Sequence, residues 1–316
     1  MNRQFDPRLY QIAVLSGLLA YGWAALGFDI SPARAALLLG TCLATQFAWI
    51  LGRRLPAFDA RSALISGLSL CLLCRASDPL LAAAAATIAI SSKFLVRIRG
   101  KHVFNPTNIG LAVMLLLSNA VWVSPGQWGN PASFAFLMAG LGFLVVTRAA
   151  RADVTLAFLC FYFALVAGRS YWLGEPAAIP IHRLQSGALL LFAFFMISDP
   201  KTTPDSRAGR LLFAALVAAG AWYVQFRLFR TNGLLWSLAC GSLLVPFIDR
   251  LLPGSRYAWS AFAPCGASAR QAALLAPLPR RGWHRQPAIV NPQPPEATNA
   301  PFHSFRRARL VSLGLR

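Results

Sequence analysis

The chain has 316 residues, of which 57% are hydrophobic and only 13% are charged. Soluble globular domains carry about 25% charged residues, so this composition excludes an ordinary soluble protein and predicts an all-α polytopic membrane protein. The formal net charge of +20 would suit a nucleic-acid partner, but the basic residues lie in short loops between apolar runs and in the C-terminal tail. That distribution is typical of membrane topology and of contact with anionic headgroups, so we expect membrane lipid and no nucleic acid as partners.

Apolar runs predict about ten transmembrane helices, because a helix needs about 20 residues to cross a hydrocarbon core of about 30 Å. The expected segments are residues 9–28, 35–52, 62–75, 79–97, 107–123, 133–149, 152–168, 184–198, 209–228 and 233–250. The third and the eighth are too short to span alone, and we expect each to be a half-spanning or tilted helix inside the bundle. The first run lacks a small-residue cleavage site, which predicts a retained helix.

Three short sequence matches in the same order indicate an internal duplication. Residues 47–53 match 163–169, Ser66-Gly67 matches Ser186-Gly187, and Ser77-Asp78-Pro79 matches Ser198-Asp199-Pro200. The repeats are expected at about residues 9–123 and 133–250. Because five segments separate matching elements, the halves face opposite ways, and such inverted repeats place a ligand site near the midplane where their broken helices meet. The alternative is that Ser-Asp-Pro is a turn signal that occurs twice.

The distribution of basic residues also predicts orientation. Thirteen lie on the N-terminal side of the bundle and six on the other side, so we expect a multi-pass protein of the bacterial inner (plasma) membrane with both termini in the cytoplasm. Residues 1–263 form the expected membrane domain, and the Pro/Arg-rich residues 264–316 are expected to be disordered. Cys71-x-x-Cys74 supplies at most two ligands, so core packing is favoured and no metal site is expected.

A first polar cluster lies between the fourth and fifth apolar segments. The chain turns at Gly100 and enters the next helix through Asn105-Pro106, where Asn105 can cap the free N–H groups. A helix N-terminus beside Lys101 and His102 suits an anionic or hydrogen-bonding ligand. Asn108 lies at membrane depth, where an amide needs a partner. The alternative is a cytoplasmic loop that is basic because of topology alone.

A second polar cluster follows the eighth segment and contains Asp199, Lys201, Thr202 and Arg210. An ionisable residue at membrane depth is a functional candidate by default, so Asp199 and its counterpart Asp78 are candidate ion or proton ligands. The alternative is that each aspartate caps the turn that follows it.

At these clusters the chain resembles the NqrB/RnfD family, the membrane subunits of the sodium-translocating NADH:quinone oxidoreductase and of the Rnf electron-transport complex. The resemblance covers about residues 10–260 and is strongest in GKHVFNPTNIGLA and in HRLQSGALLLFAFFMISDPKTTPDSRAGRLLFAALV with the later VPFIDR. It implies a ten-helix, two-repeat subunit that binds flavin and takes part in electron transfer coupled to Na+ or H+ movement. It also implies other complex subunits, a redox partner protein and a quinone as partners.

One departure concerns the cofactor. The family's flavinylation motif, Ser-[Gly/Ala/Ser]-Ala-Thr, holds FMN through its threonine, but this chain has VSPGQWGNPAS in that loop and leucine at position 189. We therefore expect FMN or riboflavin to be bound non-covalently.

The resemblance and the two clusters together define a candidate binding site without a catalytic residue of its own. Its residues are expected to be Lys101, His102, Asn105, Asn108, Asp199, Lys201, Thr202 and Arg210. The cofactor then carries the redox chemistry, and the protein binds and orients it. The alternative function is a channel or transporter for a small solute on the same inverted-repeat scaffold, without redox chemistry.

Overall fold

The computed structural model describes residues 6–55, 58–124 and 132–257. Its elements are α1 (Pro7–Ala25), α2 (Pro32–Gly52), α3 (Ala60–Leu73), β1 (Cys74–Ala76), α4 (Pro79–Leu95), β2 (Arg97–Ile98), β3 (Lys101–His102), α5 (Pro106–Leu117), β4 (Val121–Val123), α6 (Ala132–Arg148), α7 (Ala152–Trp172), α8 (Ala178–Leu184), α9 (Gly187–Leu191), the π-helix η2 (Phe192–Met196), α10 (Arg207–Phe226) and α11 (Gly233–Leu251). Each expected apolar segment contains a helix, with the eighth divided among α8, α9 and η2. The fifth, 107–123, is shorter than expected, since its helix ends at Leu117 and its last three residues form β4. The expected disordered tail, 264–316, lies outside the described residues.

Proline and a capping side chain define where several helices begin. Helices α1, α2, α4 and α5 each have proline in the first turn, where its missing N–H group costs nothing. The residues before these prolines are Asp6, Ser31, Asp78 and Asn105, and each accepts a hydrogen bond from a backbone N–H of the first turn. These local signals explain why the predicted starts agree closely with the structure.

Within the described residues, four helices are long and apolar enough to cross a membrane, namely α2, α7, α10 and α11. The pair formed by α8 and α9–η2 passes the same test together but bends by 49°, so it counts as a fifth span or as a re-entrant segment. Helices α3, α4, α5 and α6 are apolar but shorter. The expected number of ten spans therefore stays a prediction.

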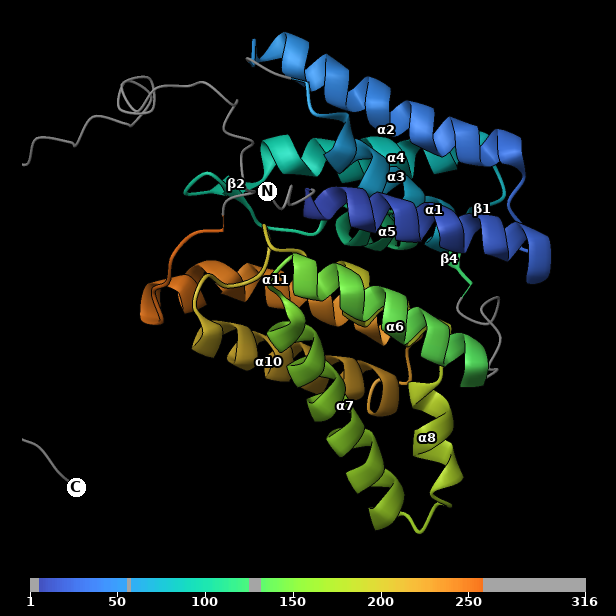
Figure 1. Ribbon diagram of the computed structural model, residues 1–316, viewed down its shortest axis with the longest axis vertical. Helices are drawn as coiled ribbons and strands as arrows, with labels where there is room; N and C mark the ends of the chain where they lie inside the picture. Colours follow the sequence, from blue (N-terminus) through green and yellow to red (C-terminus); the bar gives the residue numbers. More distant parts are fainter. Residues whose placement is uncertain (1–5, 56–57, 125–131, 258–316) are drawn as a thin grey trace, which may run out of the picture. The chain divides into compact units, whose positions relative to one another are not determined.

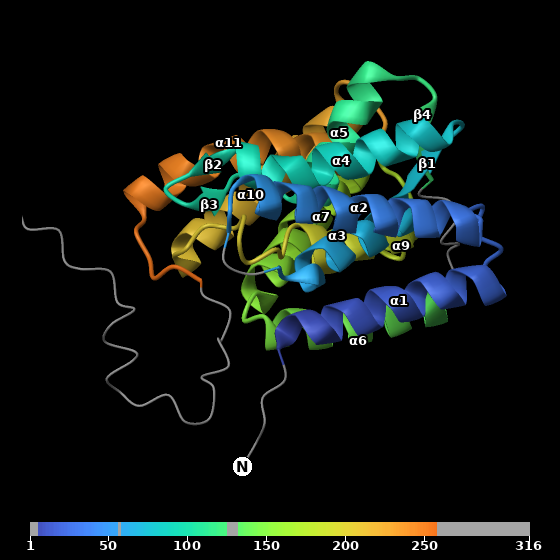
Figure 2. The ribbon, with the colours of Figure 1, turned by 90° about the horizontal axis from the view of Figure 1, so that it is seen from above.

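Several helix contacts of residues 6–124 recur in residues 132–257, but the close contact between α2 and α3 has no comparable counterpart between α7 and α9. In the first half, α4 packs against α2 and α5, and α1 packs against α3; in the second, α10 packs against α7 and α11, and α6 packs against α9. Figure 1 shows the first half (blue to cyan) above the second (green to orange), and Figure 2 shows α1 lying along α6. The halves also meet where α5 contacts α11.

Two short antiparallel ladders accompany the helices and were not predicted from the sequence. Strand β1 follows α3 and pairs with β4, with Arg75 opposite Trp122, and β2 pairs with β3. Backbone groups that leave a helix inside a membrane protein need other partners, which the β1–β4 pairing supplies for the end of the short helix α3. Figure 1 places β2 at one end of the bundle and β1 and β4 at the other.

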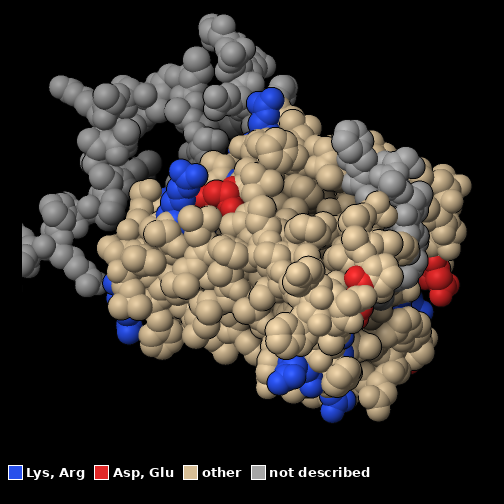
Figure 3. All heavy atoms as spheres, turned by 90° about the horizontal axis from the view of Figure 1, so that it is seen from below, with Lys and Arg blue, Asp and Glu red and all other residues tan. Residues whose placement is uncertain are grey.

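The outer surface is consistent with a lipid environment. Large apolar side chains such as Leu80, Leu116 and Phe247 are 60–76% exposed. Figure 3 shows a face that is largely uncharged, with Lys and Arg gathered near its edges. An apolar belt with basic groups at its borders is typical of a multi-pass membrane protein.

Candidate functional site

The two polar clusters of the sequence meet at one cavity of about 280 Å³. Its walls come from the starts of α1 and α5, from α3, from the β2–β3 hairpin, from the end of α6, and from η2 with the turn that follows it. Five predicted site residues line this first cavity: Lys101, His102, Asn105, Asp199 and Lys201. The structure therefore brings together residues that are about a hundred positions apart in the sequence.

The β2–β3 hairpin brings Lys101 and His102 to the cavity. Its two central residues, Arg99 and Gly100, both have positive φ, at 52° and 80°. That combination is typical of a type I′ turn, whose twist matches the strands it connects. The turn sets Arg97 opposite His102, so both side chains belong to one wall of the cavity.

Asn105 joins the start of α5 to the end of η2. Its Oδ1 accepts a hydrogen bond from the Asn108 backbone N–H at 3.1 Å, which confirms the predicted cap. Its Nδ2 donates to the Met196 carbonyl oxygen at 3.3 Å and to Asp199 Oδ2 at 3.4 Å. The buried side-chain amide of Asn105 thus hydrogen-bonds to backbone groups at the start of α5 and at the end of η2, and holds these two helix ends together at the cavity wall.

Asp199 caps its own turn and also lines the cavity. Its Oδ1 accepts from the Lys201 backbone N–H at 3.0 Å, as the turn-cap alternative predicts. Asp78 does the same with the Leu80 N–H at 2.7 Å, but Asp78 is exposed and is not part of the cavity wall. The two candidate ion ligands therefore share a local geometry without sharing this site.

Lys101 is held by three acceptors. Its Nζ donates to the Thr203 carbonyl at 2.5 Å, to Asp205 Oδ1 at 3.0 Å and to Asp249 Oδ2 at 3.1 Å. An ammonium group has three donors, so these contacts satisfy it fully. Lys101 ties the hairpin to α11 and to the turn before α10, and it helps to form the cavity with all its donors in use.

Lys201 and Arg97 are lining cations with few protein partners. Lys201 Nζ donates to the Tyr257 carbonyl at 3.0 Å, and Arg97 Nη2 donates to the Gly100 carbonyl at 2.7 Å. Neither forms an ion pair within residues 6–55, 58–124 and 132–257. Burial lowers the pKa of Lys201 and outweighs the opposing charge of Asp199. A ligand with a negative charge would stabilise both cations.

His102 is expected to be neutral at pH 7. Burial lowers the pKa of its imidazole, and the charges of Lys93, Arg97 and Lys201 add to that effect, whereas Asp199 opposes it. A neutral imidazole offers one hydrogen-bond donor and one acceptor to a ligand.

Three further predicted residues lie away from the cavity wall. Asn108 is fully buried where α5 meets α11, and its Nδ2 donates to the Leu235 carbonyl at 3.2 Å. Thr202 is buried in the turn and donates to the Asp199 carbonyl at 3.3 Å. Arg210 binds Asp153, with Nε at 2.8 Å from Oδ2. These side chains support the turn and the helix contacts around the site.

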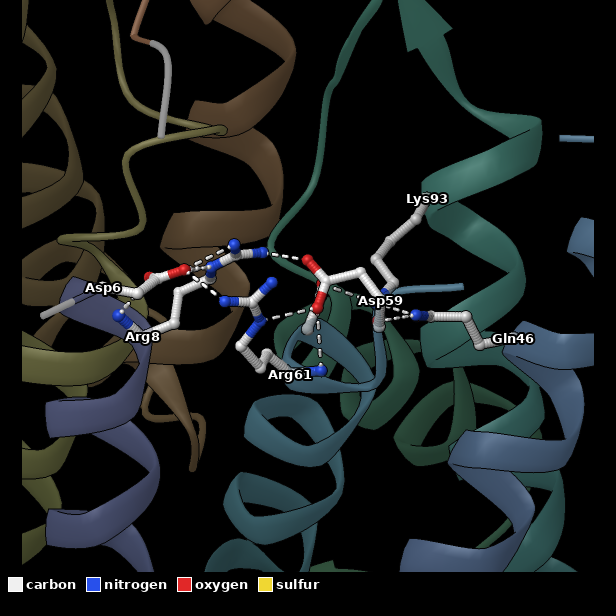
Figure 4. Close-up of polar contacts among 7 residues, drawn as sticks. Asp6, Arg8, Gln46, Asp59, Arg61 and Lys93 are labelled. Carbon is white, nitrogen blue, oxygen red and sulfur yellow. Dashed lines mark hydrogen bonds and ion pairs between the residues drawn. The ribbon is translucent and has the colours of Figure 1, made fainter. Parts of the chain in front are cut away.

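An ionic cluster at the starts of α1 and α3 was missed from the sequence. Arg8 binds Asp6, with Nη2 at 2.7 Å from Oδ2, and also contacts Asp59. Arg61 binds both carboxylates, at 2.7 Å from Asp6 and 2.9 Å from Asp59. Figure 4 shows both arginines directed toward these aspartates. Since Arg8 lines the cavity, this cluster fixes one of its walls.

The pKa values of these aspartates lie below the ordinary value. Burial acts to raise the pKa of Asp6, but its hydrogen bonds from Arg8 and the charges of Arg8 and Arg61 outweigh burial. Burial likewise opposes the lowering of the pKa at Asp59, where hydrogen bonds and charge from Arg61 and Arg8 prevail. Both groups are therefore carboxylates at neutral pH.

A buried lysine of α4 extends the polar contacts beyond Asp59. Lys93 Nζ donates to Gln46 Oε1 at 3.0 Å and to Ser62 Oγ at 2.9 Å. Gln46 in turn contacts the Asp59 carbonyl, and Ser62 lines the cavity. A lysine and a glutamine inside apolar helices were the sequence signals that could have predicted this pair.

The remaining wall is partly hydroxyl and partly aromatic. Ser62, Ser66 and Ser69 lie on one face of α3, and Phe194 and Phe195 of η2 also line the cavity. The combination of hydroxyl and amide groups, aromatic rings and lining cations suits a planar polar ligand with an anionic substituent.

Comparison with known proteins supports a family relationship over part of the chain. Residues 118–258 match the sequence profile of a family described as NQR2, RnfD, RnfE. The D-type subunit of an ion-translocating oxidoreductase complex from Erwinia tasmaniensis is 32% identical over 127 residues, which are 39% of this chain and 34% of the relative. Proteins with the same description from Salmonella paratyphi B and Salmonella newport are each 34% identical over 125 residues, with the same shares.

The match therefore confirms the resemblance that the second polar cluster predicted. It includes the motif within 182–250, whereas the motif within 93–112 lies outside residues 118–258. The aligned part spans about a third of the length of these relatives. Together with the apolar helices, the match indicates a multi-pass membrane protein.

Proposed function

We propose that this chain is a membrane subunit of an ion-translocating electron-transport complex, and that the first cavity binds a flavin non-covalently. Three relatives described above are named as the D-type subunit of an ion-translocating oxidoreductase complex. The observation that carries the cofactor proposal is the cavity itself, because it gathers five residues of the two family motifs. Other complex subunits, a redox partner protein and a quinone are proposed as partners on the same basis.

The residues present fit FMN or riboflavin. His102 and the serines of α3 offer donors and acceptors for a flavin ring, Asn105 offers the remaining lone pair of its Oδ1, and Phe194 and Phe195 offer aromatic surface. Arg97 and Lys201 can neutralise a phosphate. The volume of about 280 Å³ is close to the lower limit of small-molecule sites. The flavinylation motif is missing from the matching loop, part of which, 125–131, lies outside the described residues.

The protein's own part is to bind and orient. A bound flavin would supply the electron transfer. Asn105 fixes the start of α5 against the end of η2, and the Lys101 contacts hold the hairpin that also lines the cavity. Asp199 and His102 are lining groups able to exchange a proton, so they are the candidates for coupling to Na+ or H+ movement.

We further propose that the two halves are inverted repeats that yield ten spans. The contacts that recur in both halves, α4 with α2 and α5 and α10 with α7 and α11, support a duplication, although the α2–α3 contact does not recur. The short helix α3 leads to β1 at one end of the bundle, while η2 leads to the turn near β2 at the other, as opposite orientation requires. A bacterial inner-membrane location with both termini in the cytoplasm follows from the positive-inside distribution.

The absorbance spectrum of the purified full chain tests this function. A flavin band near one equivalent supports the proposal, and its release into the supernatant after acid precipitation supports non-covalent binding. Colour that stays with the pellet would contradict that part. A colourless preparation that transports a small solute in vesicles would support the solute-channel alternative instead.

Matched substitutions test the site. Asp199→Asn should lower flavin retention and electron transfer without loss of expression, because it alters a cavity wall. Asp78→Asn removes the same type of turn cap at an exposed position, so it should leave flavin content unchanged. Equal effects of the two variants would reduce Asp199 to a turn cap.

A further inference from the structure

A second cavity of about 460 Å³ lies apart from the proposed flavin site, and the described residues that line the two cavities do not overlap. It is formed where α9 and η2 meet the loop between α10 and α11, with contributions from the end of α3 and from α7. Neither the sequence motifs nor the comparisons assign it a ligand.

The second cavity repeats the plan of the first. Asn105 precedes α5 and lines the first cavity, and Asn232 precedes α11 and lines the second. The matched serines follow the same pattern, since Ser66 lines the first cavity and Ser186 lines the second. The loop between α4 and α5 lines the first cavity through the β2–β3 hairpin. The loop between α10 and α11 lines the second cavity through Arg230. These matched positions rest on the proposed duplication.

At the matched positions the second cavity is apolar where the first is polar. Three residues after each serine stand Ser69 in the first cavity and Leu189 in the second. Two residues after each asparagine stand Thr107 and Leu234. Phe192 extends the apolar wall. The second cavity therefore has a more apolar wall at these positions than the first.

The lining of the second cavity is positively charged, although Glu175, which pairs with Arg169, also acts electrostatically on Arg183. Arg183 and Arg230 both line it, and none of the described residues around it is acidic. Arg183 lies over the Phe226 ring with its guanidinium carbon 4.9 Å from the centroid, and in the part of the chain that the structure describes neither arginine forms an ion pair. The polar hydroxyl of Tyr162 is already bonded to Gln225 at 2.7 Å. The two arginines thus favour an anion.

The position of the cavity indicates which anion. Tyr171, Trp172 and Phe229 are 83–90% exposed, and Arg169 at the end of α7 lies 4.4 Å over the ring of Phe226 at the end of α10. Exposed aromatic side chains at the ends of apolar helices are typical of the membrane interface. An amphiphile at this level has its headgroup beside the arginines and its chain beside the leucines.

We propose that the second cavity binds an anionic phospholipid, with its phosphate between Arg183 and Arg230 and an acyl chain along Leu189, Phe192 and Leu234. The charges and the apolar wall carry this assignment independently of the duplication. A soluble anion would leave the apolar wall unused, and a zwitterionic lipid would leave the arginines without net compensation.

Native mass spectrometry of the detergent-purified full chain tests the proposal, with dioleoyl phosphatidylglycerol and dioleoyl phosphatidylcholine as probes. We expect one retained phosphatidylglycerol and a clear preference over phosphatidylcholine. Arg183→Gln with Arg230→Gln should weaken phosphatidylglycerol binding about 30-fold, since each arginine near an anionic lipid contributes about a five- to sixfold factor and the two factors multiply. The matched control is Arg53→Gln with Arg54→Gln, which removes the same charge outside the cavity and should keep the preference.

A variant that fills the cavity distinguishes lipid binding in the cavity from lipid binding to surface charge in general. Leu234→Trp keeps both arginines but occupies the apolar wall, so it should also lose the retained lipid while keeping the elution volume of the folded protein. Equal losses in the cavity and control double variants, equal binding of the two lipids, or unchanged binding in Leu234→Trp would overturn the proposal. Flavin content is read in the same samples, so failure of the proposed function is seen separately.

Discussion

Replacing Lys101 with methionine removes the ammonium group that joins the β2–β3 hairpin to α11 and to the turn before α10. Its acceptors are the Thr203 carbonyl and the carboxylates of Asp205 and Asp249. Methionine keeps much of the length and the apolar stem of lysine, so the change is mainly electrostatic. The two carboxylates then face each other without their shared cation.

The magnitude follows from the burial of the cluster. The side chains of Lys101, Asp205 and Asp249 are 10–17% exposed, so water screens them only partly. Removing one partner of a buried ion pair costs about 3–5 kcal/mol, and the residual exposure favours the lower limit, about 3 kcal/mol. Since 1 kcal/mol shifts Tm by about 2–4 °C in a domain of this size, we expect Tm to fall by about 6–12 °C.

Thermal unfolding followed by tryptophan fluorescence in one fixed detergent measures this effect. Arg99→Met is the matched control, because it removes one positive charge from the same hairpin at an exposed residue without an ion pair in the described chain. Adding Asp249→Asn to Lys101→Met should recover part of the loss, since it removes one of the two uncompensated charges. A Lys101→Met shift no larger than that of Arg99→Met, or no recovery in the double variant, would refute the reasoning.

Two further predictions concern the walls of the first cavity. The pKa of Asp59 and of Asp6 lies below the ordinary value of 3.8, so the stability that these carboxylates add is present above that value and is lost as pH falls below it. Tm measured from about pH 6 to about pH 3 should fall less in Asp59→Asn than in the parent; parallel curves would contradict this. Gly142→Ala would place a Cβ atom 2.7 Å from Phe194 Cβ, so we expect about 1–3 kcal/mol of destabilisation and lower flavin content. Gly140→Ala meets nothing within 4 Å and should keep both Tm and flavin.

The helices could be predicted from the sequence because their signals are local. Apolar runs give their extent, and a capping residue followed by proline gives the start, as at Asp78-Pro79 and Asn105-Pro106. The β1–β4 ladder could not be predicted this way, because it joins Cys74–Ala76 to residues almost fifty positions later. Such pairing depends on tertiary packing, which a local pattern does not contain.

The site could be predicted in part for the same reason. Asn105 and Asp199 were expected to face a ligand, and both line the cavity. Asn108 and Arg210 belong to the same motifs, but their side chains meet Leu235 and Asp153 instead. The motifs alone therefore do not distinguish residues that line the cavity from residues that stabilise its surroundings. That distinction depends on which neighbouring helix each side chain contacts.

The ionic cluster shows the opposite case. Arg8 is 51 positions from Asp59, and Lys93 is 47 positions from Gln46. Charges at helix starts, such as Arg8 and Asp59, are also what topology alone would produce, and although Lys93 and Gln46 stand out inside apolar helices, the sequence does not say which residue each of them contacts. Only the packing of α1, α3 and α4 makes the pairing evident.

The π-helix η2 has a consequence for how tolerant this region is to insertion and deletion. The Ile197 N–H bonds to the Phe192 carbonyl five residues earlier, so the segment holds one residue more per turn than an α-helix does. Loss of one residue within Phe192–Met196 can be absorbed by a return of this turn to α-helical geometry, whereas loss of one residue from a regular α-helix rotates everything after it by about 100°. A single deletion inside the π turn should therefore disturb the placement of Asp199 less than a single deletion from a regular helix such as α10 would disturb the residues that follow it.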